Sequence, residues 1–355
     1  MRHPSRRDFV RYCTAAAAAA GAASWLPGPT RAAAVAWPEP KFVRTNGIRM
    51  AVYEAGQGFP VVFSHGFPEL AYSWRSQVAA LAGAGFRAIA PDQRGYGQTD
   101  RPADVDQYTI VHLCGDLAGL LDTLQIEKAV FCGHDWGGAV VWMMPLLFPD
   151  RVAGVIGVNT AFLPRAPSPP IAMLRQARGE NNYVVAFQQP GVADQALAKN
   201  VEKSFRLFFR QGRMTAEEFA KLPADSPARK FELLSMLEAE VPLDAPLVVS
   251  DDDLRFYVDT YERTGFTGGI NWYRNIDRNW ELTKHVEYKV KVPSLYVGAA
   301  DDVVLPPSSA NGIERWVPDI EKKTIADCGH WTQQEKPAEL NAILIDWLKR
   351  KIQPS

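Results

Sequence analysis

Gly133-His134-Asp135-Trp136-Gly137-Gly138 is the part of this chain that says most about its fold. The apolar run Lys128 to Cys132 precedes it, and the helix-compatible run Ala139 to Phe148 follows it. A strand, a nucleophile between small residues and then a helix form a strained turn that lifts one side chain above a sheet. Small residues flank such turns because a Cβ there would collide with neighbouring backbone. The stretch predicts Asp135 at the apex; the alternative is a Gly-rich turn whose Asp only caps the helix.

The residue at this apex is a carboxylate and not a hydroxyl. A serine in this position would attack acyl carbons. A carboxylate is better suited to displacement at a saturated carbon, where it leaves a covalent ester. A serine esterase is therefore the least favoured class of enzyme.

The bulk properties fit one large domain with an insertion. The chain has 355 residues, of which 47% are hydrophobic and 22% charged, and its net charge is −1. That length exceeds an average domain and suits a large α/β domain that carries an insertion. No sustained basic or acidic block is present in the sequence, so nothing indicates a nucleic-acid partner.

Residues 1–36 are typical of a bacterial export signal. The twin-arginine pattern Ser5-Arg6-Arg7-Asp8-Phe9-Val10 precedes a short Ala-rich stretch from Thr14 to Leu26, and small-residue cleavage sites follow near Ala34. We expect a twin-arginine signal that sends the folded protein to the periplasm or outside the cell, without stable membrane association once it is removed. An uncleaved membrane anchor is the alternative, although the stretch is about half the length that spans a bilayer.

Three cysteines lie beyond that signal, namely Cys114, Cys132 and Cys328. Their number is odd and their spacing does not match a metal site. We expect buried thiols outside disulfides, because two of them lie in apolar strand or helix patterns.

Short β-rich runs alternate with helical patterns from residue 37 to about 161. Asn46-Gly47 predicts a hairpin turn between two strands. The next strands are expected at 60–64, 86–91, 128–132 and 152–158, with helices at 70–84 and 109–125 between them. This alternation predicts a mostly parallel, twisted sheet covered by helices on both faces.

The alternation stops after Thr160. Prolines at 164, 167, 169 and 170 mark an exit from the sheet, and about 120 residues of helical pattern follow. Ser250 and Asp253 form a capping box for a helix that Gly265 ends. Strand patterns return at 292–297 and 321–326, before a last helix at 337–352. The sequence predicts an α/β core made of 37–161 and 291–355, with a helical lid at 162–290.

The core supplies partners for an Asp nucleophile in the order that such a turn requires. Asp301 and Asp302 follow one late strand, and His330 follows the next. His330 would act as general base, and one carboxylate would fix its tautomer and stabilise the imidazolium. Chemistry alone does not separate Asp301 from Asp302.

An earlier loop, His65-Gly66-Phe67-Pro68, has the composition expected of an oxyanion hole. The backbone N–H of Phe67 would donate one hydrogen bond to the developing charge, and that of Trp136 the second. An ordinary turn at a strand end is the alternative.

Taken together, these motifs make the chain resemble an epoxide hydrolase of the α/β-hydrolase superfamily, most of all the hydrolase domain of soluble epoxide hydrolases. The likeness covers about Phe42 to Ile352. It rests on the following stretches: His65-Gly66-Phe67-Pro68-Glu69, Gly133 to Gly138, Asn271-Trp272-Tyr273-Arg274-Asn275 and Asp327-Cys328-Gly329-His330-Trp331-Thr332. The resemblance implies the α/β-hydrolase fold with a helical lid, and it favours Asp302 as the acid.

The same resemblance implies how the ring opens. Family members use two lid tyrosines to stabilise or protonate the departing oxygen, and Tyr183 and Tyr273 match those positions. Phenols suit this task because they stay protonated near neutral pH. His65, Pro68, Trp272 and Trp331 belong to the same motifs, and we expect them to contact substrate.

The implied reaction joins a small apolar epoxide with water and needs no metal or organic cofactor. A haloalkane dehalogenase is the nearest alternative, because it shares the Asp nucleophile and the triad; the tyrosine pair favours the epoxide. A non-catalytic binding protein of the same fold is the second alternative, and an intact set of catalytic residues argues against it. The identity of the epoxide and the oligomeric state are left open.

Overall fold

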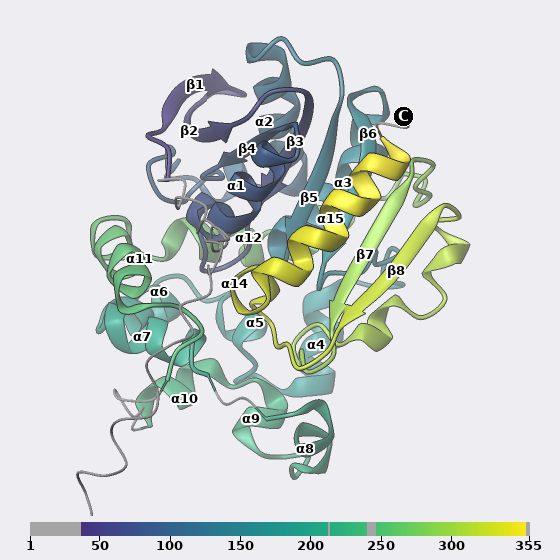
Figure 1. Ribbon diagram of the computed structural model, residues 1–355. Coiled ribbons are helices and arrows are strands. Elements are labelled where there is room, and N and C mark those ends of the chain that lie inside the picture. The colour runs from purple at the N-terminus through teal and green to yellow at the C-terminus, as the bar shows by residue number, and fades with distance from the viewer. Residues whose placement is uncertain (1–36, 212–213, 240–245, 353–355) are drawn as a thin grey trace, which may run out of the picture. The chain divides into compact units, whose positions relative to one another are not determined.

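An eight-stranded sheet forms the centre of the computed structural model, which describes residues 37–211, 214–239 and 246–352 (Figure 1). The strands lie in the order β1-β2-β4-β3-β5-β6-β7-β8. β2 pairs antiparallel with β1 and β4, and all other neighbours are parallel. The strands are Lys41–Thr45 (β1), Ile48–Ala55 (β2), Phe59–Ser64 (β3), Phe86–Pro91 (β4), Ala129–His134 (β5), Val152–Val158 (β6), Ser294–Ala299 (β7) and Ile320–Ile325 (β8). The predicted mostly parallel sheet is confirmed.

Helices cover both faces of this sheet. α1 (Arg75–Gly83) and α15 (Pro337–Lys351) pack together on one face, while α2 (Ile110–Thr123) and α3 (Trp136–Leu147) pack on the other. Every residue of β5 and β7 is buried as a result. Double coverage explains why these strands read as continuous apolar runs in the sequence. One difference is that the expected helix at 70–84 begins with a 3₁₀ turn, Ala71–Trp74, before α1.

The segment between β6 and β7 is helical, as its pattern predicted. Its helices are Pro170–Arg178 (α4), Tyr183–Ala186 (α5), Val192–Ala198 (α6), Val201–Phe208 (α7), Ala216–Lys221 (α8), Pro227–Lys230 (α9), Leu233–Glu238 (α10), Asp251–Thr264 (α11), Thr267–Arg274 (α12) and Ile276–Leu282 (α13). The predicted lid limits at 161/162 and 290/291 lie in the connections at 159–169 and 283–293. The capping box of Ser250 with Asp253 is present at the start of α11, and Gly265 ends that helix with φ +66°.

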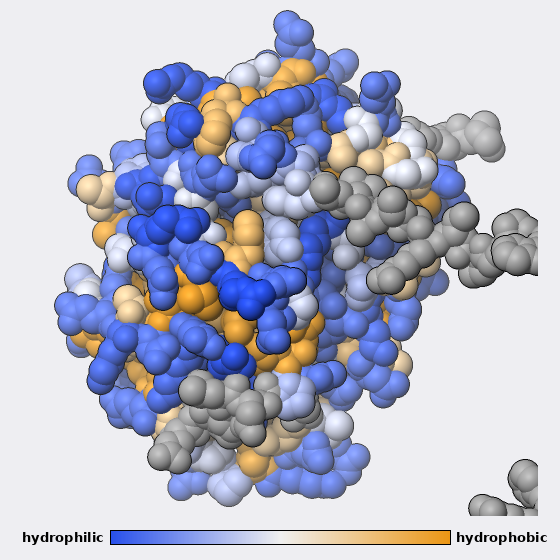
Figure 2. Space-filling view, turned by 60° about the vertical axis from the view of Figure 1, so that its left-hand side comes forward, coloured by the Kyte–Doolittle hydropathy of each residue, from blue (hydrophilic) through white to orange (hydrophobic). Residues whose placement is uncertain are grey.

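Two further predictions concern the cysteines and residues 1–36. Cys114, Cys132 and Cys328 are buried thiols, as expected. The proposed export signal at 1–36 lies outside the described residues. Within those residues, no helix combines the length and hydropathy needed to cross a membrane. On the face shown in Figure 2, hydrophobic residues reach the surface in groups between hydrophilic ones.

Candidate active site

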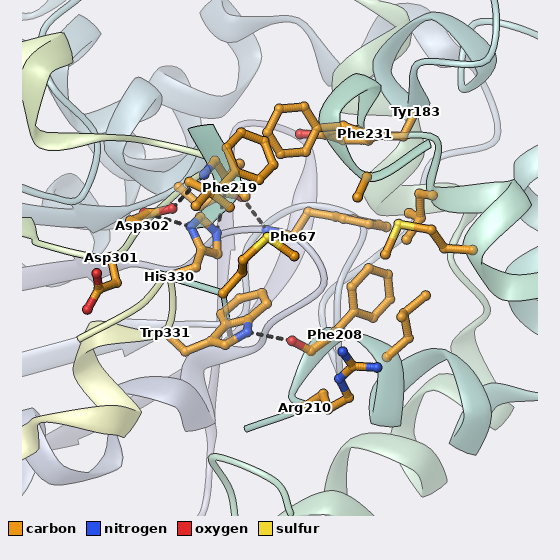
Figure 3. Close-up of a pocket in the computed structure, with 18 of the residues that line it drawn as sticks. Phe67, Tyr183, Phe208, Arg210, Phe219, Phe231, Asp301, Asp302, His330 and Trp331 are labelled. Atoms are coloured by element: carbon orange, nitrogen blue, oxygen red, sulfur yellow. Dashed lines mark hydrogen bonds and ion pairs between the residues drawn. The ribbon is translucent and has the colours of Figure 1, made fainter. Parts of the chain in front are cut away.

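The loops after three parallel strands bring the predicted catalytic groups together. Asp135 follows β5, Asp302 follows β7 and His330 follows β8. The carboxyl ends of parallel strands meet at one edge of a sheet, which is where α/β proteins place their ligands. Tyr183 at the start of α5 and Tyr273 in α12 belong to the lid and line the same cavity as Asp135, Asp302 and His330. Figure 3 shows this cavity, with Tyr183 among its labelled lining residues.

The backbone at Asp135 forms the predicted strained turn. Its φ of +52° and ψ of −122° lie in a region that L side chains rarely adopt. The next helix turn passes so close to β3 that a Cβ on Gly137 would lie 2.0 Å from the Ser64 carbonyl oxygen. The hydroxyl of Thr160 donates a hydrogen bond to the Asp135 carbonyl at 2.9 Å. No side-chain hydrogen bond from Asp135 caps α3, so the helix-cap interpretation fails.

The two carboxylate oxygens of Asp135 have different neighbours. Oδ1 accepts a hydrogen bond from the backbone N–H of Phe67 at 2.9 Å. Oδ2 lies 3.9 Å from Nε2 of His330, beyond hydrogen-bonding distance. The N–H of Phe67 therefore already holds one oxygen of the nucleophile. The second oxyanion donor, the N–H of Trp136 at the start of α3, stays a prediction.

Asp302 orients the imidazole of His330. Its Oδ2 lies 2.9 Å from Nδ1 of His330 and accepts a hydrogen bond from Nδ2 of Asn159 at 2.7 Å. Its Oδ1 accepts from the N–H groups of Val304 and Leu305 at 2.9 and 3.0 Å. Burial would raise the pKa of Asp302, but His330 and these hydrogen bonds lower it well below its usual range. Asp302 is thus an ionised partner that keeps Nε2 of His330 directed at Asp135.

Asp301 and Asp302 separate clearly in space, although chemistry alone left them equivalent. The side chain of Asp301 points away from His330 in Figure 3. Its Oδ1 instead accepts a hydrogen bond from the backbone N–H of Ala216, in the lid, at 3.4 Å. Of the two carboxylates, Asp302 is the one that pairs with His330.

The two lid phenols meet above Asp135. The ring centroids of Tyr183 and Tyr273 are 5.7 Å apart, with the ring planes at 72° to each other. Burial, and then the charge of Asp135, raise the pKa of Tyr183 above its usual range; burial raises the pKa of Tyr273 as well. Both groups stay protonated near neutral pH and can donate hydrogen bonds. The ring of Trp136 packs edge-on against that of Tyr273, with centroids 5.1 Å apart.

A cavity of about 300 Å³ connects these groups with the lid. Its walls are mostly apolar, which suits an apolar substrate. Met214 and Val304 line it and are each 37% exposed, so they mark its mouth. The lining residues are Phe67, Asp135, Tyr183, Leu207, Phe208, Arg210, Met214, Phe219, Ala228, Phe231, Leu233, Met236, Tyr273, Asp301, Asp302, Val303, Val304, His330 and Trp331.

Of the four predicted substrate contacts, Trp331 lines this cavity, whereas His65, Pro68 and Trp272 do not. The ring of His65 is fully buried, and its Nε2 accepts a hydrogen bond from the backbone N–H of Gln93. Burial lowers the pKa of His65 to about 4, so it stays neutral. Pro68 is buried too. These side chains lie outside the lining of the catalytic cavity, because neighbouring residues of one motif point to different sides of the backbone.

Proteins from other organisms resemble this chain in sequence and in structure. A family model described as the alpha/beta hydrolase fold matches residues 60–337. The chain belongs to the α/β-hydrolase fold family. Epoxide hydrolase A of Mycobacterium tuberculosis is 43% identical over 316 residues, which is 88% of this chain and 97% of that protein. The crystal structure of Epoxide Hydrolase A from Mycobacterium thermoresistibile matches with a TM-score of 0.78 at 41% identity, and the match covers 88% of this chain and 98% of that one.

Bifunctional epoxide hydrolase 2 of Sus scrofa is a longer relative. It is 41% identical over 304 residues, which is 85% of this chain but 54% of that protein. The chain thus spans about half the length of such bifunctional relatives. Within the α/β-hydrolase family, the chain falls among the epoxide hydrolases.

Two buried polar groups that support this α/β-hydrolase site were not predicted from the sequence. Asn159 follows β6 with φ +58° and donates to Asp302. Glu69 accepts hydrogen bonds from the amide groups of two glutamines, Gln333 and Gln334, and its Oε2 lies 3.1 Å from Nδ1 of His134. The other ring nitrogen of His134 lies 2.6 Å from the carbonyl oxygen of the base, His330. Glu69 stood in a quoted motif, but only its place in the fold shows this contact.

Among residues 37–211, 214–239 and 246–352, no group of three or more His, Cys, Asp or Glu is arranged to hold a metal ion. The arrangement instead offers a carboxylate nucleophile, a general base and paired acid donors around one apolar cavity. Such a set can carry out nucleophilic displacement followed by hydrolysis of the resulting ester.

Proposed function

We propose that this protein is an epoxide hydrolase, which adds water to an apolar epoxide and releases a vicinal diol. The observation that carries the proposal is that two lid phenols, the partly buried Tyr183 and the buried Tyr273, share one cavity with the carboxylate of Asp135. A carboxylate opens the ring only if the departing oxygen is stabilised or protonated, and paired phenols supply that acid. The names of the relatives support the same reaction class.

In the first half-reaction, Oδ2 of Asp135 attacks a ring carbon of the epoxide. The ring C–O bond breaks, and its electron pair goes to the oxygen, which takes a proton from one of the two phenols. The second phenol stabilises this oxygen by a hydrogen bond. The product is an ester between Asp135 and a carbon that carries a neighbouring hydroxyl group.

In the second half-reaction, Nε2 of His330 takes a proton from water, and the water oxygen bonds to Cγ of the Asp135 ester. Negative charge develops on Oδ1, which already accepts a hydrogen bond from the N–H of Phe67. The bond between Cγ and Oδ2 then breaks, and His330 returns the proton to the departing diol oxygen. The second proton of the water, left on the Asp135 carboxyl group, passes to the phenolate formed in the first half-reaction, which restores both groups. Asp302 stabilises the imidazolium while it exists.

The dehalogenase alternative needs an N–H donor for the departing halide. Trp136 is the residue beside the nucleophile that could supply it, and its ring packs against that of Tyr273. A dehalogenase has no use for paired phenols, whereas Tyr183 and Tyr273 line the same cavity as Asp135, which favours the epoxide.

One turnover in H₂¹⁸O, with enzyme in excess over an aryl epoxide, tests the covalent route. We expect the label in the side chain of Asp135 and an unlabelled diol, both measured by mass spectrometry of peptides and product. Asp301→Asn serves as the matched control and should label Asp135 in the same way. A labelled diol with unlabelled Asp135 would rule out the ester, and turnover of haloalkanes but not of epoxides would favour the dehalogenase.

We also propose that residues 1–36 direct export by the twin-arginine route and that the mature enzyme acts in the periplasm or outside the cell, without stable membrane association. The pair Arg6-Arg7 and the Ala-rich stretch behind it support this. In a bacterial host, replacing both arginines with lysine should leave the full-length precursor in the cytoplasm. Cleaved periplasmic protein from that variant would contradict the proposal.

A further inference from the structure

One side chain of the lid bridges the two backbone segments that carry the phenols. Gln188 stands two residues after α5, the helix that begins with Tyr183. Its Nε2 donates a hydrogen bond to the carbonyl oxygen of Val184 at 2.9 Å and another to that of Tyr273, in α12, at 3.0 Å. A carboxamide nitrogen carries two N–H groups, so both bonds can form at once. A single carboxamide thus spans the gap between α5 and α12.

A second side chain crosses the same gap in the opposite direction. Arg274, at the end of α12, donates from Nε to the carbonyl oxygen of Phe187 at 3.1 Å and from Nη2 to that of Gln189 at 3.2 Å. These two carbonyl groups flank Gln188 along the chain. Nη2 of Arg274 also lies 2.6 Å from Oδ2 of Asp194 in a largely buried ion pair, which keeps the guanidinium in place. The two side chains therefore clasp α5 and α12 together.

Helix α5 has only four residues and depends on contacts from outside. A single helical turn is unstable in isolation, because it fixes several residues for one hydrogen bond. Its first residue, Tyr183, donates from the backbone N–H to the carbonyl oxygen of Phe231 at 3.0 Å, which ties α5 to the end of α9. The clasp ties it to α12, which carries the second phenol.

Ring packing surrounds the phenol side chains, whereas the clasp acts on the backbone that carries them. The ring of Phe187 lies 5.5 Å from that of Tyr183 and 5.0 Å from that of Tyr273, centroid to centroid. Aromatic pairs form over a range of about 4.5–7 Å between centroids, so packing alone leaves the spacing of the two phenols loose. A hydrogen bond weakens steeply outside a narrow range of distance and angle. Two hydrogen bonds from one nitrogen therefore fix this spacing more closely.

We propose that Gln188 is a positioning residue for ring opening: its carboxamide sets the spacing of Tyr183 and Tyr273, so that both phenols reach the same epoxide oxygen. Its side chain is not among those that line the catalytic cavity, so it acts through the two tyrosines. A displacement of about 1 Å in a reacting geometry can cost about 10²-fold in rate, so a small change in this spacing matters. This role rests on the proposed function, because it concerns the step in which the phenols donate.

Two matched substrates distinguish positioning from a general loss of stability. Propylene oxide and trifluoropropylene oxide are similar in size. On attack at the unsubstituted ring carbon, the trifluoromethyl group makes the departing oxygen less basic, so that oxygen needs less help from an acid. Gln188→Met keeps the length of the side chain and removes both donors. We expect it to lower kcat/KM about 30-fold for propylene oxide and about threefold for trifluoropropylene oxide.

Gln189→Met is the matched control, because it changes an exposed side chain at the next position and keeps the backbone carbonyl that Arg274 contacts. It should leave kcat/KM for both substrates within about twofold of the wild type. If Gln188→Met does not fold, Gln188→Glu takes its place. A carboxylate has the shape of the carboxamide but cannot donate, so the same unequal losses are expected.

The rate of ester formation locates the effect in the reaction. In His330→Gln, where the proposed mechanism predicts that the ester accumulates, adding Gln188→Met should slow adduct formation with propylene oxide about 30-fold. Quenched-flow samples analysed by intact-mass spectrometry would measure this rate. In Gln188→Met alone, the ester formed from trifluoropropylene oxide should break down at the wild-type rate, because His330 and Asp302 are unchanged.

Three outcomes would overturn the role of Gln188. Equal losses on both substrates would mean that it only stabilises the fold. An unchanged kcat/KM for propylene oxide would mean that ring packing alone positions the phenols. Slower ester breakdown at an unchanged rate of ester formation would place its effect in the strand-end loops. Each of these contradicts only the positioning role, whereas a wild type that opens neither epoxide contradicts the proposed function itself.

Discussion

The catalytic groups of the strand-end loops and those of the lid are held by different kinds of contact. Asp302, after β7, accepts hydrogen bonds from Asn159 and two backbone N–H groups and contacts His330. The lid phenol of Tyr273 lies among rings, with ring centroids of Phe187 at 5.0 Å and Trp136 at 5.1 Å. Directed hydrogen bonds hold the loop groups, and apolar packing holds the lid group.

This difference matches a division of the proposed reaction. His330 and Asp302 act when the ester is hydrolysed, whereas Tyr183 and Tyr273 act when the ring opens. Both steps pass through Asp135, the one group that each half-reaction uses. Changes in the two regions should therefore stop the reaction at different points, and that is the most direct way to test whether the regions are functionally separate.

His330→Gln should have the largest effect, because it removes the general base but leaves the nucleophile. We expect turnover to fall by at least about 10⁴-fold, while an ester accumulates on Asp135. Intact-mass spectrometry after addition of a reactive epoxide would detect this as an adduct. The matched control is His330→Gln combined with Asp135→Asn, which should form no adduct. A single variant that loses turnover and shows no adduct would contradict the division.

Tyr183→Phe with Tyr273→Phe should stop the reaction earlier, at ring opening. Loss of both donors should lower turnover by at least about 10³-fold, and loss of one by about 10²-fold. Added to His330→Gln, the double change should abolish the adduct that His330→Gln alone accumulates, which stopped-flow or quenched-flow mass measurements would follow. Full retention of epoxide turnover would contradict the assignment of Tyr183 and Tyr273 as the acid donors.

The strand-end groups were predictable because each stands in a short motif directly after a strand. Periodicity located β5, β7 and β8, and parallel strands bring their carboxyl ends together, so the order of Asp135, Asp302 and His330 along the chain implied their meeting. The pattern did not show that Asn159 supports Asp302. That contact depends on a positive φ at Asn159, directly after β6, and a single Asn in a sequence does not predict such a backbone conformation.

The lid was predictable as helical but not as a set of cavity walls. Its amphipathic patterns show which residues are apolar, whereas the way that short helices pack decides which of them face the substrate. Only the structure shows that Phe219, Phe231 and Arg178 line cavities. Trp272 is the opposite case. Its motif predicted a substrate contact, but its ring is fully buried in the core.

Asn159→Ala tests how the strand-end loops keep Asp302 ionised. Because the pKa of Asp302 is lowered on folding, its contribution to stability is present above the unfolded pKa of about 4 and is lost as the pH falls through the folded value. Removing the Asn159 hydrogen bond should raise the folded pKa, so the contribution becomes smaller and is completely lost at a higher pH. We expect stability at pH 7 to fall by about 2 kcal/mol.

Urea unfolding of Asn159→Ala and the wild type at several pH values between about 2 and 7 would measure this. The difference in unfolding free energy should be largest near neutral pH and shrink toward acid, because protonation of Asp302 removes the charge that the Asn159 hydrogen bond stabilises. A difference that stays constant across this range would mean that Asn159 stabilises the fold without acting on Asp302.

Trp272→Phe should have the smallest effect on activity, because Trp272 supports the lid and does not line the cavity. Its Nε1 donates a hydrogen bond to the Arg94 carbonyl oxygen at 3.1 Å, and its ring is fully buried. Losing that bond and leaving a small void should lower the free energy of unfolding by about 2 kcal/mol. KM for a small epoxide should stay within about twofold, because binding keeps all its contacts. Urea unfolding and steady-state kinetics on the same preparation would check both values. A large rise in KM at unchanged stability would show that Trp272 contacts the substrate. The distinction between residues that support the lid and residues that bind substrate would then not hold for Trp272.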